Sequence, residues 1–281
     1  MPDAVHQQTL VSVYEVARTS YQTLRAEIEH GHWAISFVRE GVVETLTRGV
    51  RDMAPAGSVM IHPPSLPYAE YAEVPGTHEW IVFECDVRPG LALLRLYPVA
   101  AVVRVAAPAA FSALFGVLLE AWEAPALAAR DLRVSALTLQ LLGLVLESWQ
   151  ASGSPPRPPA LMTAQDRFSG LIVFLSQNLD RKLGRDEIAA FVHLQPNYLD
   201  RAFRRAYGAA PMRMLRDLRV QRARHLLESS DHTVAAVAAL CGFEEAGYFS
   251  RAFRRETGQT PGEYRRSLAA ARRSYSGAKE A

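Results

Sequence analysis

The apolar residues follow two different periods along this chain, and the change of period divides it into regions. Between about residues 20 and 106, short β-rich runs alternate with turn residues, a pattern typical of a small antiparallel barrel or sandwich. Prolines at 55 and at 63–64 delimit one of these runs, since proline has no N–H to donate to a sheet. The predicted strands are Trp33–Val38, Gly41–Leu46, Ser58–Ile61, Trp80–Phe83 and Val102–Val105.

Helical spacing replaces this pattern at residue 108. Phe111 and Phe115 recur at a four-residue interval, as do Leu137 and Leu141, so we predict two amphipathic helices within 108–150. The second apolar stripe is widened by Leu139, Leu142 and Leu146. This extra width leaves two interpretations open, a contact between subunits or simple packing on the β-rich region.

A proline-rich stretch separates these regions from the rest of the chain. Residues 151–159 combine small residues with four prolines, a composition that sustains neither a helix nor a central strand. We therefore predict a domain at 1–150, a linker at 151–165 and an all-helical domain at 166–271. The polar residues 272–281 are predicted to form a disordered tail.

A segment of the helical region occurs twice. Tyr198–Arg205 and Tyr248–Arg255 are identical at six of eight positions. Upstream the register slips by one residue, so that residues 188–190 correspond to 237–239. A repeat of this kind indicates one basic two-helix module that is used twice.

Each copy of the module has the spacing of a helix-turn-helix. A short apolar helix, Arg185–Val192 or Thr233–Leu240, precedes a tight turn and a second helix that begins near Pro196 or Glu245. A single linker helix, Pro211–Ser229, is predicted between the copies.

The turns and caps of the two copies differ in sequence. Thr233 can cap its helix, because its hydroxyl accepts a bond from an unpaired N–H of the first turn. Gly242 suits a turn with positive φ, whereas His193 occupies the corresponding position of the first copy at a higher conformational cost.

The outer faces of the second helices are candidates for the major groove of DNA. Their apolar residues form one stripe, so the opposite face of each helix is left for solvent or a partner. Arginine in the first half of such a helix can bind guanine, while arginine one turn later is better placed for phosphates. The predicted base-reading residues are Asn197, Asp200, Arg201, Ala246, Gly247, Ser250 and Arg251. The predicted phosphate-binding residues are Arg204, Arg205, Arg254 and Arg255.

The distribution of charge supports DNA binding by the helical region alone. Residues 1–165 hold 11 basic and 16 acidic residues and the remainder 20 and 13, so net charges of −5 and +7 underlie the overall +2. Only the basic region is then expected to bind a polyanion. Cys85 and Cys241 cannot form a disulfide framework, and we find neither a signal peptide nor an apolar run near the ~20 residues of a membrane span. A cytoplasmic location is expected.

At these residues the chain resembles the AraC/XylS family of bacterial transcription regulators. The resemblance covers about residues 166–266, and its motifs are Val237–Phe243, Tyr248–Arg255 and Gly258–Arg265. It implies that the outer faces of the second helices enter the major groove, in agreement with the helical pattern.

The N-terminal region resembles, less specifically, the cupin-like sensor domain of many members of that family. Trp33 through Gly41 and the proline punctuation carry this likeness. It implies a cupin-like β-barrel that binds an effector and supports dimerisation. The ligand-binding candidates are Trp33, Arg39, Tyr68, Tyr71 and Trp80.

We therefore predict an α+β multidomain protein that acts as a sequence-specific, ligand-responsive transcription activator. The predicted partners are double-stranded DNA, a small-molecule effector, RNA polymerase and a second copy of the chain; no catalytic residue, cofactor or metal is expected. Two alternatives stay open, a metal-dependent cupin enzyme and an architectural DNA-binding protein without effector. The enzyme would need a His-x-His pair, and His30-Gly31-His32 is the one present, without the usual glutamate after it.

Overall fold

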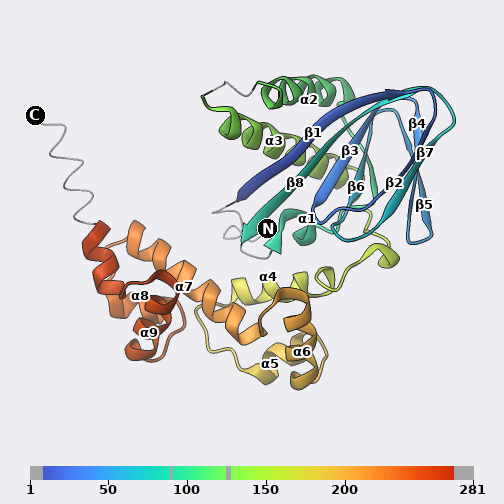
Figure 1. Ribbon diagram of the computed structural model, residues 1–281. Helices are drawn as coiled ribbons and strands as arrows, with labels where there is room; N and C mark the ends of the chain where they lie inside the picture. Colours follow the sequence, from blue (N-terminus) through green and yellow to red (C-terminus); the bar gives the residue numbers. More distant parts are fainter. Residues whose placement is uncertain (1–8, 89–90, 125–127, 269–281) are drawn as a thin grey trace, which may run out of the picture. The chain divides into compact units, whose positions relative to one another are not determined.

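The computed structural model describes residues 9–88, 91–124 and 128–268 of this chain, which contain two compact units (Figure 1). The first unit ends at Arg167 and the second begins at Phe168. Strands and covering helices make up the first unit, and helices alone make up the second. The predicted α+β layout is therefore confirmed. The predicted tail at 272–281 lies outside the described residues.

The strands of the first unit form two antiparallel sheets. The six-stranded sheet has the order β1-β8-β3-β6-β10, with β9 paired to β8, and the four-stranded sheet has the order β2-β7-β4-β5. The first sheet contains β1 (Leu10–Tyr21), β3 (Trp33–Glu40), β6 (Ser58–His62), β8 (Gly76–Arg88), β9 (Leu91–Ala92) and β10 (Val102–Arg104). The second contains β2 (Leu24–Ile28), β4 (Val42–Thr47), β5 (Val50–Pro55) and β7 (Tyr68–Ala72).

These sheets pack face to face as a sandwich and do not close into the predicted barrel. Val38 and Met60 of one sheet contact Val43 and Ala54 of the other in a fully buried cluster. Closure would require the edge strands β1 and β10 of the first sheet to pair with the edge strands β2 and β5 of the second, and no such ladder forms within the described residues. The barrel is thus corrected to the sandwich, the other architecture that the strand spacing allowed.

The predicted strands are present, with Trp80–Phe83 forming the middle of the longer β8. Five further strands, β1, β2, β5, β7 and β9, were not predicted. In β1 the pairing with β8 shifts between Val13 and Glu15. Because this irregularity breaks the two-residue alternation, the longest edge strand carries no clear period in its sequence.

Two helices cover the outer face of the six-stranded sheet, as predicted for residues 108–150. They are α2 (Pro108–Trp122) and α3 (Arg130–Ala151) (Figure 1). The ring centres of Phe111 on α2 and Phe37 on β3 lie 4.8 Å apart. By length and composition α3 resembles a membrane span, a test that buried core helices of soluble proteins also meet.

Part of the predicted linker packs on the first unit. Residue Pro156 forms a β-bridge with Val99. The next residue, Arg157, is only 4% exposed and donates hydrogen bonds to the carbonyl oxygens of Val99 and Leu94, each at 3.2 Å. A short 3-10 helix at Pro159–Leu161 follows. The composition of the segment is typical of a flexible linker, but its one arginine fixes it to the first unit.

A buried ion triad holds the same segment. The Asp166 carboxylate lies 3.2 Å from Arg95, which is on α1 (Leu93–Leu96), and 3.6 Å from Arg157. Both guanidinium groups also lie near the Trp33 ring, 5.4 and 5.2 Å from its centre. Because buried charges are tolerated only when they are paired, this arrangement ties the linker to the strand layer through Asp166.

The second unit consists of two helix pairs on either side of a long helix. The helices are α4 (Ser169–Gln177), α5 (Arg185–Phe191), α6 (Pro196–Tyr207), α7 (Pro211–Ser229), α8 (Val234–Leu240) and α9 (Ala246–Thr257), with residues 261–268 also helical. The linker helix α7 has the predicted bounds and contacts both pairs. Its Val220 and Ala223 join the core formed by α8 and α9.

Candidate nucleic-acid interface

The two helix pairs share one turn geometry. In the first, the His193 N–H donates to the carbonyl of Ala190 at 3.0 Å; in the second, the Gly242 N–H donates to that of Ala239 at 2.9 Å. His193 and Gly242 have φ angles of 53° and 68°, so both adopt the predicted left-handed conformation. The capping prediction is also confirmed, because Thr233 Oγ1 accepts a hydrogen bond from the N–H of Ala236 at 3.1 Å. Two different sequences therefore build the same helix-turn-helix.

The second helix of each pair is fixed by aromatic residues on its inner face. Phe203 on α6 and Phe253 on α9 are both completely buried. All the predicted base-reading residues lie on the outer faces. Asn197, Arg201, Ala246, Gly247 and Arg251 are exposed, and Asp200 and Ser250 are half-buried. Each pair thus presents one continuous outer surface.

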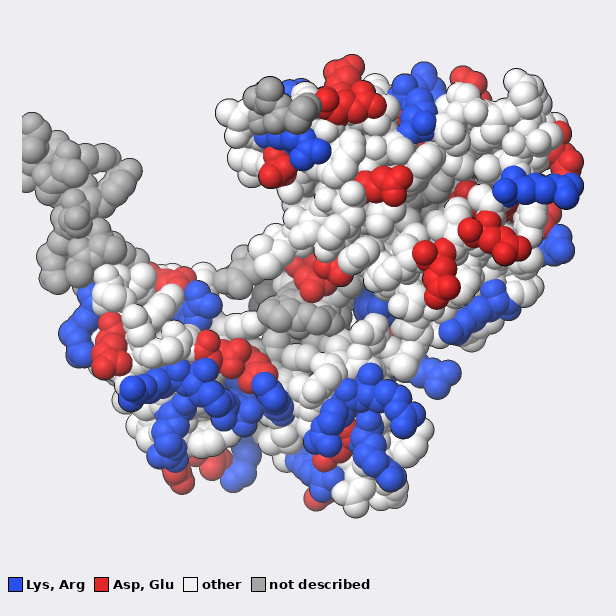
Figure 2. All heavy atoms as spheres, viewed as in Figure 1, with Lys and Arg blue, Asp and Glu red and all other residues white. Residues whose placement is uncertain are grey.

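The predicted phosphate-binding arginines occupy the last turns of these helices. Arg204, Arg205, Arg254 and Arg255 are all exposed. In the space-filling view, basic side chains gather over both helix pairs of the second unit (Figure 2). This is the surface expected of a domain that meets a polyanion.

One residue of this surface was not among the predicted site residues. Arg185, the first residue of α5, reaches α6 and binds two predicted base readers. Its Nη2 donates to Asn197 Oδ1 at 2.6 Å, and its Nε donates to Asp200 Oδ2 at 2.9 Å. The available signal was the repeat itself, since Val234 occupies the corresponding position of the second copy.

The five ligand-binding candidates of the first unit do not converge on one site. Trp33 lies beneath the Arg95 and Arg157 guanidinium groups, and the Arg39 side chain is 41% exposed, 3.5 Å from Glu79. Glu79 pairs in register with Phe37, whose ring contacts α2, so Arg39 belongs to the helix-covered side of its sheet.

The remaining three candidates are also dispersed. Trp80 donates from Nε1 to Glu15 at 3.1 Å, and Tyr71 lines an outer hollow of the four-stranded sheet. Tyr68 is buried and stacks on His62 with ring centres 3.7 Å apart. Of the five, Tyr68 has the closest contact with the buried polar groups between the sheets.

Those buried polar groups form a cluster around Glu70. His62 Nε2 lies 3.3 Å from one carboxylate oxygen of Glu70, without the alignment of a hydrogen bond, and His78 Nδ1 lies 3.9 Å from the other. The Tyr21 hydroxyl is also buried without a hydrogen-bond partner in the described part of the chain. The described residues contain no group of three side chains able to hold a metal ion.

Burial and neighbouring charge act on the titration of this cluster. Burial opposes the ionisation of Glu70, but the two histidines beside it together hold the pKa of its carboxyl below the usual value. Burial also lowers the pKa of His78, with His62 acting in the same direction and Glu70 against it. A neutral His78 next to unsatisfied polar atoms leaves hydrogen-bonding capacity inside the sandwich.

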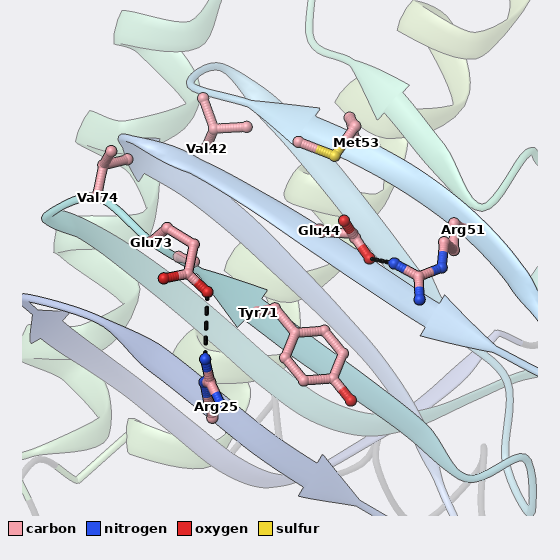
Figure 3. A pocket seen from close by; sticks show the side chains of 9 residues that line it. Arg25, Val42, Glu44, Arg51, Met53, Tyr71, Glu73 and Val74 are labelled. Atoms are coloured by element: carbon pink, nitrogen blue, oxygen red, sulfur yellow. Dashed lines mark hydrogen bonds and ion pairs between the residues drawn. The ribbon is translucent and has the colours of Figure 1, made fainter.

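The outer hollow of the four-stranded sheet has a volume of about 550 Å³. Figure 3 shows its ion pairs, Arg25 with Glu73 at 3.5 Å and Arg51 with Glu44 at 2.5 Å, on either side of Tyr71. The charged side chains are paired with each other and surround an open surface of polar and apolar residues. The side chains that line the hollow therefore do not point toward a common ligand position.

Comparison with known proteins identifies the second unit. The helix-turn-helix domain family matches residues 188–267. Over 99 residues the chain is 37% identical to the transcriptional activator RhaS of Escherichia fergusonii, a match of 35% of this chain and 36% of that protein. Over 147 residues it is 31% identical to RhaS of Salmonella schwarzengrund, or 52% of this chain and 49% of that one. It thus spans about a third to a half of these relatives.

The solved structure of the DNA-binding domain of AdpA in complex with a target DNA is also similar. It is 32% identical in sequence, covers 38% of this chain and 96% of that one, and has a TM-score of 0.37.

The twin turns, the exposed helices and these sequence matches define the class of the second unit as a helix-turn-helix DNA-binding domain. More particularly, this C-terminal domain is of the AraC type.

Proposed function

We propose that this chain is a sequence-specific transcription regulator that binds double-stranded DNA through α6 and α9. The observation that carries the proposal is the repetition of one exposed, arginine-rich helix on an identical turn within a single compact unit. The relatives named above are transcriptional activators, which favours activation, with RNA polymerase as a further partner. A cytoplasmic location agrees with this role.

The two readers would act on unlike half-elements. The linker helix α7 has 19 residues, and at 1.5 Å per residue it spans about 28 Å, close to the ~34 Å of one DNA turn. Successive major grooves on one face of the duplex are therefore within reach of α6 and α9. The outer faces of α6 and α9 differ, with Asn197 and Asp200 at the positions of Gly247 and Ser250, so the DNA site of one subunit would be asymmetric.

Binding to the chain's own promoter region tests the proposal. Purified full-length protein is titrated against a labelled duplex from that region and against a scrambled duplex of equal composition, at moderate salt. Preference for the promoter by a factor of at least ~10³ is expected of a specific regulator. Equal affinity for both duplexes would refute the regulator and leave only the architectural alternative.

A small polar effector would bind between the sheets near Glu70. The proposal is supported by the buried, unsatisfied atoms of His62, Glu70 and His78, which a hydroxyl- or amide-bearing ligand could satisfy. The full-length protein is heated with panels of such compounds while tryptophan fluorescence is recorded. All four tryptophans lie at or before residue 149, so a raised melting temperature reports on this unit. No stabilisation by any polar compound would refute the location.

A homodimer through α3 is the remaining part of the proposal. Leu132 is 74% exposed, and Leu139 and Leu146 follow it at seven-residue intervals on the same side of the helix. Leu132→Glu should convert a dimer to a monomer in analytical ultracentrifugation, while Leu10→Glu, at an equally exposed leucine of β1, should not. A metal-dependent enzyme is disfavoured because His30 and His32 are engaged separately, with the carbonyl of His32 and with Glu84.

A further inference from the structure

Two of the predicted base readers are already occupied within the protein. The Asn197 amide oxygen accepts one hydrogen bond from Arg185, and the Asp200 carboxylate accepts another while lying 2.8 Å from Nη2. An aspartate is acceptor-only, and this one has used its charge on a guanidinium. On the outer face of α6, Asn197 and Asp200 are therefore already engaged by a neighbouring helix.

The same contacts leave one end of Arg185 available. Arginine has five N–H donors in a rigid fork, and the two contacts use those on Nε and Nη2. The Nη1 group takes part in neither contact, and the side chain is 45% exposed. A guanidinium fixed at one edge and open at the other is prepared to bind an anion, because little rotamer freedom is left to lose.

The internal repeat shows that the three residues form a unit. In the second copy the positions of Arg185, Asn197 and Asp200 are taken by Val234, Gly247 and Ser250, respectively. None of the three is retained there, although the turn, the buried phenylalanine and the terminal arginines of the helix are all kept. The arrangement is thus a property of the first module and is not needed to build the fold.

We propose that Arg185 is a further phosphate-binding residue of the first helix-turn-helix and that Asn197 and Asp200 are positioning residues for it, rather than base readers. The inference rests on the proposed DNA binding. In this motif the first helix crosses the DNA backbone, so the start of α5 is on the side where phosphates lie. Pairing with Arg185 also removes the repulsion that a bare Asp200 carboxylate would meet near DNA.

The test compares variants on two duplexes over a range of salt concentrations. Arg185→Ala and Arg185→Gln are measured by fluorescence anisotropy on the promoter duplex and on the scrambled duplex. Arg181→Ala is the matched control, because Arg181 is equally exposed and is paired with Glu187 instead of α6. Circular dichroism checks that each variant is folded.

Loss of one phosphate contact should weaken binding to both duplexes by the same factor. Each phosphate contact contributes about 0.9 to the slope of the logarithm of the binding constant against the logarithm of the salt concentration. Its loss should therefore weaken binding about eightfold at 0.1 M salt relative to 1 M, and the magnitude of the slope should decrease by about one. Arg181→Ala should leave both affinities and the slope unchanged. Unchanged slopes for both Arg185 variants, or weaker binding to the promoter duplex alone, would overturn the assignment.

The positioning residues have their own readout. Asn197→Ala and Asp200→Ala should preserve the ratio of affinities for the two duplexes. In the Arg185→Ala background Asn197→Ala should have no effect, whereas Asp200→Ala should strengthen binding to both duplexes by the same factor, because it removes an unpaired carboxylate. A changed ratio would restore them as base readers and overturn the proposal. Failure of the regulator itself is distinguishable, because the wild-type chain would then show no preference between the duplexes before any variant is compared.

Discussion

Gly242 is the turn position where the surroundings are tightest, and Gly242→Ala is expected to destabilise the second unit strongly. A methyl group there would lie 2.3 Å from the carbonyl oxygen of Leu179 and 2.7 Å from the Arg219 guanidinium. That carbonyl also accepts a hydrogen bond from Arg219 Nε at 3.0 Å, so the clash falls on a contact between α7 and the chain that precedes α5.

The magnitude follows from a comparison with Gly208. Both glycines have positive φ, 68° and 73°, but a methyl group at Gly208 would meet nothing within 4 Å. The left-handed conformation alone costs a non-glycine residue about 1 kcal/mol, which Gly208→Ala should lose. Overpacking adds about 1–3 kcal/mol, so Gly242→Ala should lose about 2–4 kcal/mol of unfolding free energy.

Urea unfolding separates the two units in one experiment. Circular dichroism at 222 nm follows the helices of both units, whereas fluorescence from the four tryptophans follows the first unit alone, so a transition seen only in circular dichroism belongs to the second unit. Both variants should lower the circular dichroism midpoint, Gly242→Ala further, with the fluorescence transition unchanged. Equal losses for the two variants would refute the reasoning, because they would show that the chain around Gly242 yields to a methyl group without strain.

Three further outcomes are expected. Arg251→Ala should lose about 1–3 kcal/mol of specific binding and relax the preference at one base pair, whereas Arg255→Ala should weaken all sequences alike and reduce the salt slope by about one; identical behaviour in anisotropy titrations would contradict these roles. Asp166→Ala should destabilise the first unit by about 3 kcal/mol or more and open the chain to trypsin after Arg157, because two buried guanidinium groups lose their carboxylate; unchanged proteolysis would count against docking. The first unit should lose stability as the pH falls below the usual 6.5 of histidine, because unfolded His78 takes up a proton there while folded His78, with its lowered pKa, stays neutral; His78→Gln should flatten this slope in fluorescence-detected unfolding between about pH 5.5 and 7.5.

The helical half of the molecule was predictable from sequence because its information is local. Proline begins α7, glycine or histidine forms each turn, and Thr233 caps α8, so each boundary depends on residues a few positions apart. The repeat supplied the rest, since two copies in register identify the inner and outer faces of α6 and α9 together.

The β-rich half was less predictable because its contacts are long-range. Arg39 was expected inside a barrel, but the irregular pairing of β3 with β8 beside it places it near Glu79. Trp33 was expected against a ligand, yet its ring is covered by Arg95 and Arg157 from distant segments. Nothing local to either residue in the sequence indicates such partners.

The docking of residues 155–166 also sets a length. Fully extended, these twelve residues would span about 40 Å, more than one turn of DNA. While Arg157 and Asp166 keep this segment packed on the first unit, its residues add no length to the connection between the two units. In a dimer, the spacing of operator half-sites within reach would therefore depend on whether one buried carboxylate keeps its two arginines.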